Sequence, residues 1–310
     1  MQNSFVPEGR LYGTAENTGY IRNEAGLRLA HQTGKTLEGI VTSCSKDLDL
    51  TLDLGVITGV IPYNETVYSP DGGPVKDIAV ITRVGKPVCF KIKDIIENGE
   101  TKSAVLSRAD AQRECTEDYI SYLQPGDVIN CRVTHTEKFG AFADVGCGIT
   151  ALLPIDCISV SRISHSQDRL RAGDDIKCVV SRIEKDPFRM FLTLKELLGT
   201  WEENAAQFMP GQTVRGVVRG IEPYGIFIEL SPNLSGLSEY RDDVEPGDEV
   251  AVYIKSVDPK KMKVKLVIVG KQGRSHPSPL KYYVPENVTH VYRFIYSTPV
   301  SSKLTETDFT

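Results

Sequence analysis

Alternating apolar and polar residues recur along the chain in short runs, and many of these runs begin at a glycine. Such alternation is typical of β-strands, because successive side chains of a strand point to opposite faces. Three runs open alike, and they are GKTLEGIV from Gly34, GDVINCRV from Gly126 and GQTVRGVV from Gly211. One pattern written three times predicts a structural unit that is repeated three times.

Four further strands follow in each unit, in the same order. The second strands are DLTLDLG, GAFADVG and GIFIELS, and the third strands are TGVIPY, TALLPI and SGLSEY. After a longer connection come a second glycine-led strand (GKPVCFKI, GDDIKCVV, GDEVAVYI) and a closing strand (SAVLS, MFLTL, VKLVI). Five short strands in this arrangement predict a small OB-type barrel. We therefore expect an all-β fold of three tandem five-stranded OB-fold barrels, joined by short helical linkers.

The repeats divide the chain into seven predicted segments. These are an N-terminal arm (1–33), a barrel (34–106), a helical linker (107–124), a barrel (125–195), a helical linker (196–209), a barrel (210–270) and a C-terminal extension (271–310). Ser107 is the predicted N-cap of the first linker helix. Trp201 lies at helical spacing in the second linker, which favours packing against a barrel over stacking on a ligand.

An aromatic residue stands on the polar side of two of the second strands. In GAFADVG the apolar row is Ala141, Ala143 and Val145, so Phe142 must face away from the barrel core. The same argument places Phe227 of GIFIELS outside its barrel, whereas DLTLDLG has Thr51 at this place. The second and third barrels are thus expected to carry an outward aromatic ring that the first lacks.

A second aromatic residue and a glycine precede each of these rings. Phe139 and Tyr224 lie three residues before Phe142 and Phe227, whereas the first unit has Leu48 there. A glycine within a strand permits a bulge or strong twist, which could bring both rings to one surface. Such a pair would be a stacking platform for unpaired bases. The alternative is that the rings only cover a barrel edge.

These motifs also carry a family resemblance. KFGAFADVG and PYGIFIELS, each inside a five-strand repeat, resemble the S1-type RNA-binding domain. GCGITALLPIDCISVSRISH and KELLGTWEENAAQF are similar to bacterial ribosomal protein S1-like proteins with three such repeats, from about Pro7 to beyond Val269. The resemblance implies S1-type barrels that bind single-stranded RNA (mRNA) in translation, together with the small ribosomal subunit.

The resemblance also implies further RNA-binding positions around the last turn of each barrel. They fall on Asp186 and Arg189 in the second unit and on Asp258 and Lys263 in the third, and Lys138 opens the first motif. The family's third-strand histidine is absent: Pro62, Pro154 and Glu239 stand in its place, and the charge of Glu239 would repel phosphate. A basic connection, SVSRISHSQDRLR, adds Arg162, His165 and Arg169 as candidates for backbone contacts, or else is a solvated loop with helix caps.

Composition narrows the function further. The chain has 310 residues, a net charge of −5 and a pI of about 5.7, so bulk positive charge cannot drive nucleic-acid binding. Its seven cysteines are scattered, and Cys131, His135, Cys147, Cys157, His165 and Cys178 match no zinc-site spacing. We therefore expect reduced thiols, no metal and no cofactor, in a soluble cytoplasmic protein. Without a catalytic motif, an enzyme is not expected.

The first barrel favours a different use. Asp47, Asp49 and Asp53 lie on or near the face that carries rings elsewhere, and this face should repel phosphate. We expect residues 1–106 to dock a partner, with small ribosomal subunit proteins as candidates. The alternatives for the whole chain are a protein-docking scaffold and an accessory factor of RNA decay or transcription. In the C-terminal extension, Tyr292, Phe294 and Tyr296 share a strand face and are expected to pack on the chain's own barrel.

Overall fold

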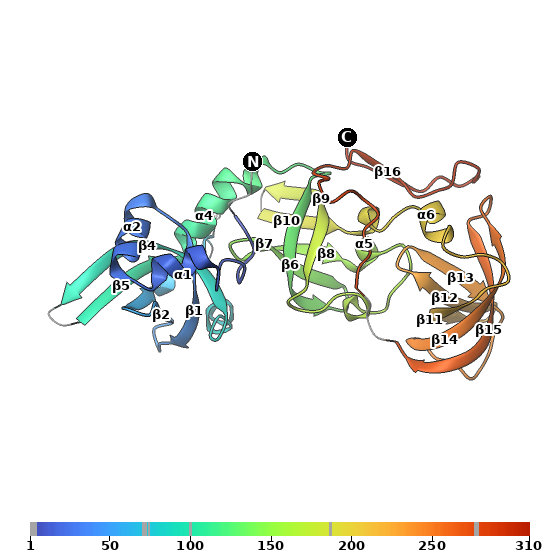
Figure 1. Cartoon of the computed structure of the whole chain (residues 1–310), viewed down its shortest axis with the longest axis horizontal. Helices are drawn as coiled ribbons and strands as arrows, with labels where there is room; N and C mark the ends of the chain where they lie inside the picture. Colours follow the sequence, from blue (N-terminus) through green and yellow to red (C-terminus); the bar gives the residue numbers. More distant parts are fainter. Residues whose placement is uncertain (1–4, 70–72, 74, 99–100, 186–187, 276–278) are drawn as a thin grey trace. The chain divides into compact units, whose positions relative to one another are not determined.

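The structure is a computed structural model of the whole chain (Figure 1), and it describes all residues except 1–4, 70–72, 74, 99–100, 186–187 and 276–278. The chain forms two compact units. The first comprises residues 1–123, 144–150 and 184–189, and the second comprises residues 124–143, 151–183 and 190–310. In the described part of the chain, the helices are too short or too polar to cross a membrane.

Three closed five-stranded barrels account for most of the fold, as the sequence predicts (Figure 1). Around each barrel the strands follow the order first, second, third, fifth, fourth. Barrel 1 consists of β1 (Leu37–Cys44), β2 (Leu50–Asp53), β3 (Thr58–Ile61), β4 (Pro87–Asn98) and β5 (Thr101–Ser107). Barrel 2 consists of β6 (Val128–Glu137), β7 (Gly140–Gly146), β8 (Ile149–Pro154), β9 (Asp175–Lys185) and β10 (Phe188–Thr193). Barrel 3 consists of β11 (Thr213–Glu222), β12 (Gly225–Ser231), β13 (Leu234–Ser238), β14 (Asp248–Asp258) and β15 (Lys263–Arg274).

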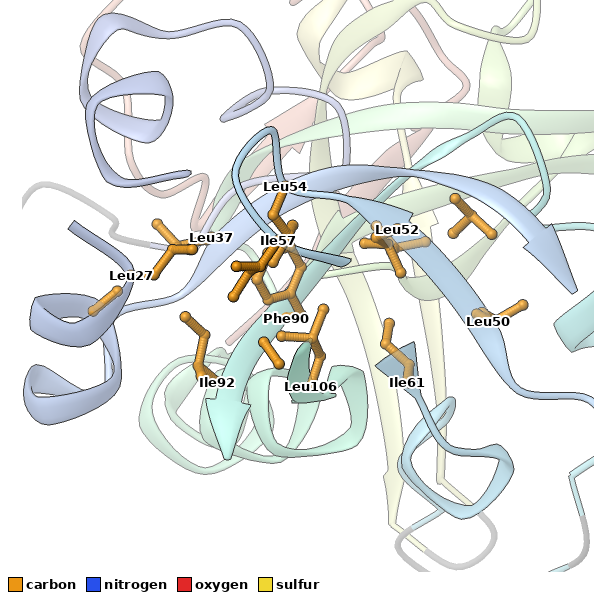
Figure 2. Packing of buried hydrophobic residues seen from close by; sticks show 14 of the residues in the cluster. Leu27, Leu37, Leu50, Leu52, Leu54, Ile57, Ile61, Phe90, Ile92 and Leu106 are labelled. Carbon is orange, nitrogen blue, oxygen red and sulfur yellow. The ribbon is translucent and has the colours of Figure 1, made fainter. Parts of the chain in front are cut away.

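The apolar rows of the second strands point into the barrels. In barrel 1, Leu50, Leu52 and Leu54 are fully buried and pack with Phe90 and Leu106 from β4 and β5 (Figure 2). In barrel 2, the alanines and valine of β7 are fully buried. In barrel 3, the two isoleucines of β12 belong to the core cluster and Leu230 packs against it. The alternate positions of each strand therefore face outward, as the pattern predicts.

Two helices lie in the N-terminal arm, for which the sequence analysis names no helix. They are α1 (Ala15–Ile21) and α2 (Glu24–Thr33). The side chains of the N-cap residues Thr14 and Asn23 accept the backbone N–H groups of Asn17 and Gly26. Leu27 of α2 joins the core of barrel 1 (Figure 2). The arm is therefore a structured cover of the first barrel, because its apolar face completes the barrel core.

The linkers between barrels are helical, as expected. Ser107 caps α4 (Arg108–Asp118) by accepting the N–H of Asp110. Trp201 begins the short α6 (Trp201–Ala205) and lies in the core cluster of barrel 3, which confirms its packing role. The remaining short elements are η1 (Tyr63–Glu65), α3 (Asp77–Ile81), η2 (Ile120–Tyr122), α5 (Ile155–Ile158), η3 (Ser166–Asp168) and η4 (Lys195–Leu197).

The C-terminal segment (residues 279–310) runs along the second unit and touches both of its barrels. On barrel 2, Tyr282 accepts the N–H of Lys177, and His290 lies 2.7 Å from Asp127. On barrel 3, the buried Tyr296 donates its hydroxyl to the carbonyl of Asn233 at 2.7 Å. The segment also holds a two-stranded sheet of β16 (Arg293–Ile295) and β17 (Glu306–Asp308). It fastens barrels 2 and 3 to one another.

Candidate nucleic-acid interface

An aromatic pair lies on the outside of barrel 2, at the start of β7. Phe139 is 56% exposed, and its ring centroid lies 6.0 Å from that of the half-buried Phe142, with the ring planes at 89°. The edge of one ring thus meets the face of the other, a favourable geometry for aromatic rings. Both rings reach one surface, as the sequence analysis proposed.

Barrel 3 repeats this pair in nearly the same geometry. The rings of Tyr224 and Phe227 lie 6.1 Å apart with their planes at 90°, and both are exposed. Packing needs of two different cores do not require the same exposed ring pair. The repetition therefore favours a shared surface role for the two pairs.

A glycine with positive φ makes each pair possible. Gly140 has φ 156° and Gly225 has φ 151°. A Cβ at Gly140 would lie 2.4 Å from the carbonyl oxygen of Leu153, and one at Gly225 would lie 2.5 Å from that of Ser238. Since real Cβ atoms do not approach backbone so closely, only glycine lets the neighbouring strand pass behind the rings.

The two pairs differ in what covers the second ring. In barrel 2, the imidazole of His135 stacks on Phe142 with centroids 4.4 Å apart and planes at 14°. In barrel 3, Gly220 pairs with Phe227 across the strands and presents no side chain. From the sequence, His135 is considered only as a zinc ligand, a role that its spacing excludes. Its role beside the ring could have been found by aligning the first strands of the two units.

Barrel 1 carries no such pair at these positions. Leu48, at the place of Phe139, adopts φ 67° and packs against the core of barrel 1. The carboxylate of Asp49 accepts the N–H of Tyr63, so it is used within the fold. Thr51 stands at the place of Phe142. The outer face of the first barrel is therefore built differently from the other two.

A groove of about 570 Å³ lies beside the aromatic pair of barrel 3. It is lined by both rings, by Leu237 and by polar side chains of three chain segments, namely Ser235, Ser238, Glu239, Lys255, Lys263 and Lys265. Lys263 is thus a predicted residue that the structure places at the pair, whereas Lys255 and Lys265 were missed. Their outward positions in β14 and β15 were the available signal.

The other last-turn residues have different surroundings. Asp258 pairs with Lys263 across β14 and β15, and its carboxylate accepts the N–H of Lys261, so it shapes the turn. Arg189 is exposed in the first unit. Asp186 lies outside the described residues. Lys138 is exposed next to Phe139.

The basic connection of barrel 2 divides into exposed and buried residues. Arg162 is exposed. His165 caps η3, because its Nδ1 accepts the N–H of Gln167 while Asp168 accepts the N–H of His165. Arg169 is only 7% exposed, and its guanidinium is bound by Glu229 at 2.7 and 2.8 Å. The expectation that Arg169 contacts RNA is therefore corrected: its charge is used inside the protein.

Acidic residues two positions after each outward ring are buried beneath other segments. Asp144 accepts N–H groups from Glu8, Gly146 and Gly148 at 2.7–3.0 Å. Burial and the nearby Glu8 carboxylate raise its pKa to about 7. For Glu229, burial raises the pKa, but the hydrogen bonds and charges of Arg169 and Arg219 outweigh it and hold the pKa below its ordinary value. Neither carboxylate therefore faces a ligand.

The cysteines and acidic residues do not gather into a metal site. All seven cysteines lie in the described part of the chain, where they are free thiols. Within that part, no three His, Cys, Asp or Glu side chains converge as metal ligands would.

Comparisons with known proteins agree with this geometry. Residues 122–195, which span barrel 2, match the family described as S1 RNA binding domain. The small ribosomal subunit protein bS1 of Staphylococcus aureus is 27% identical over 281 residues, covering 86% of this chain and 68% of that protein. The bS1 protein of Rhizobium meliloti is 26% identical over 253 residues, covering 77% of this chain and 44% of that protein.

Three barrels of one topology, two with the same aromatic pair, define an OB-fold repeat protein. The second barrel matches the S1 RNA binding domain, and most of the chain is similar to bS1 proteins. It spans less than half the length of the Rhizobium relative. Among solved structures, a multidomain protein with nucleic acid binding domains from Streptococcus pneumoniae has a TM-score of 0.25 and 13% identity, covering 82% of this chain and 76% of that one.

Proposed function

We propose that the protein binds single-stranded RNA across the aromatic pairs of barrels 2 and 3. One observation carries this proposal: two barrels hold the same exposed ring pair, at 6.0 and 6.1 Å and near 90°. Unpaired bases stack on such rings regardless of sequence, and nearby lysines neutralise the phosphates. The match of barrel 2 to the S1 RNA binding domain supports the same function.

The protein acts in translation, in association with the small ribosomal subunit in the cytoplasm. The names of its bS1 relatives support this step. Barrel 1 with the N-terminal arm serves as the docking part, because Leu48 and Thr51 replace the rings there and Leu48 packs inward. The function is binding rather than catalysis.

The double variant Phe142→Ala with Phe227→Ala tests the RNA proposal. Each base–ring contact contributes about 1–3 kcal/mol, so affinity for oligo(U) RNA at fixed salt should fall roughly thirtyfold or more. The circular dichroism spectrum and the unfolding midpoint should change little, because the rings lie outside both cores. Tyr122→Ala, which removes an exposed tyrosine far along the sequence from either pair, is the control and should retain affinity.

Two results would contradict the proposal. If the double variant binds RNA as tightly as the wild type at the same salt, the rings are not a platform. If the variant unfolds instead, the rings are structural and the alternative of an edge cover is correct.

A further inference from the structure

The groove of barrel 3 contains the carboxylate of Glu239, which has no ion-pair partner among the described residues. Glu239 lines this groove together with Lys255, Lys263 and Lys265, yet none of the four forms an ion pair with a described residue. Elsewhere in barrel 3, lysine and arginine side chains do pair with acids, as Lys271 does with Asp248 at 2.7 Å. The groove thus presents acceptors and cations to solvent, beside two aromatic rings.

Glu239 lines the same groove as the two aromatic rings. It directly follows β13, whose last residue Ser238 pairs with Ile226 and lies with its carbonyl against Gly225. Gly225 separates the two rings in sequence, so Glu239 is positioned next to the aromatic pair. The three lysines come from β14 and β15 on the other strands of the groove. The carboxylate and the lysines of the groove therefore come from different strands or strand ends.

We propose that Glu239 makes barrel 3 selective for guanine, and this inference rests on the proposed RNA binding. Bases of single-stranded RNA expose their Watson–Crick edges. A carboxylate has two acceptor oxygens, and guanine offers two adjacent donors, N1–H and the N2 amino group. Such charge-assisted bidentate bonds are strong and geometrically specific.

The other bases fit this carboxylate less well. Adenine and cytosine offer one amino group beside an acceptor nitrogen. Uracil offers one N–H between two carbonyl oxygens, which oppose a carboxylate. Barrel 2 has Pro154 at the equivalent position, and proline has no side-chain polar group. Barrel 3 therefore selects guanine, whereas any base can stack on the rings of barrel 2.

The test compares guanosine with inosine, which keeps N1–H but lacks the N2 amino group. The probes are oligo(U) strands of roughly 12 nucleotides with guanosine or inosine at alternate positions, since OB barrels cover about 4–16 nucleotides each. The full-length protein should bind the guanosine strand about tenfold more tightly than the inosine strand. Glu239→Gln and Glu239→Ala should bring this ratio close to one. Glu202→Gln removes an exposed glutamate of α6, outside the groove, and should keep the ratio.

Each other outcome overturns the inference in a distinguishable way. If the wild type does not discriminate the strands while Tyr224→Ala with Phe227→Ala still weakens binding, the platform exists but Glu239 does not select. If the ratio survives in both Glu239 variants, another group selects guanine. If the wild type binds none of these RNAs, the proposed function itself fails and the inference fails with it.

Discussion

Arg169 of barrel 2 and Glu229 of barrel 3 form a buried, bidentate ion pair, at 2.7 and 2.8 Å. Arg219 binds the same carboxylate at 2.7 Å and approaches Asp168 at 3.6 Å. Further hydrogen bonds join the same two segments, since Val160 donates its N–H to the side chain of Asn233 and Ser161 donates its N–H to the carbonyl of Pro232. Barrels 2 and 3 thus meet through a buried polar interface.

Removing the carboxylate should destabilise the second unit. In Glu229→Gln, two buried guanidinium groups lose their counter-charge, so the free energy of unfolding should fall by about 3–5 kcal/mol. Urea unfolding followed by Trp201 fluorescence reports on this unit, because Trp201 is the chain's single tryptophan and lies in the core of barrel 3. Glu249→Gln breaks the partly exposed pair with Arg215 and should cost under about 1 kcal/mol. Equal losses in the two variants would contradict the buried-pair account.

Gly225→Ala should destabilise the protein more than Gly211→Ala does. Gly211 also has a positive φ, of 93°, but a Cβ there would meet no atom within 4 Å. Alanine at Gly211 should therefore cost only backbone strain, about 1–3 kcal/mol. Gly225→Ala adds a collision with the carbonyl of Ser238 at 2.5 Å, so it should unfold at lower urea and bind RNA more weakly. Urea unfolding measures the loss of stability, and RNA binding at fixed salt measures the loss of affinity. Unchanged RNA affinity in a folded Gly225→Ala protein would show that the glycine does not place the rings.

Acidification should stabilise the first unit through Asp144. The pKa of its carboxyl is raised from 3.8 to about 7, by burial and then by the charge of Glu8, so the folded state binds a proton that the unfolded state has released. Between about pH 4 and pH 7, stability should consequently fall as pH rises. Amide hydrogen exchange of β1, β4 and α4 measures the stability of this unit at each pH. Burial also raises the pKa of Glu38 in the same unit to about 7, so this group contributes a dependence of the same sign. Asp144→Asn should therefore lessen the slope, and an unchanged slope in that variant would assign the dependence to Glu38 or another group.

The strand pattern could be predicted because barrel strands depend on local signals. The second strands of barrels 2 and 3 occupy the predicted residues, Gly140–Gly146 and Gly225–Ser231. Each begins at a glycine, and its apolar residues recur with a period of two along the face that is buried in the barrel. The ring pairs could be predicted for the same reason, since the filled inward row leaves Phe142 and Phe227 only the outside.

Residues whose environment is set by distant segments could not be predicted in this way. Arg169 looks like a surface arginine in its own loop, and only Glu229, 60 residues further along the chain, explains its burial. The arm helices were missed although Thr14 and Asn23 are N-cap residues, because short helices gain most of their stability from packing such as that of Leu27. Tyr292 is exposed whereas Tyr296 is buried, so the strand pattern that they share does not predict which of the two side chains is buried.

The C-terminal segment has a kinetic consequence. Asp127 and His290 are 163 residues apart in sequence, and Val291 donates its N–H to the carbonyl of Gly126. During synthesis, this edge of barrel 2 has no partner until all of barrel 3 has left the ribosome. Contacts that close such long loops form late and slow the folding of a domain. Barrel 2 should therefore remain incompletely covered until barrel 3 has folded. The two barrels should then unfold and refold as one cooperative unit.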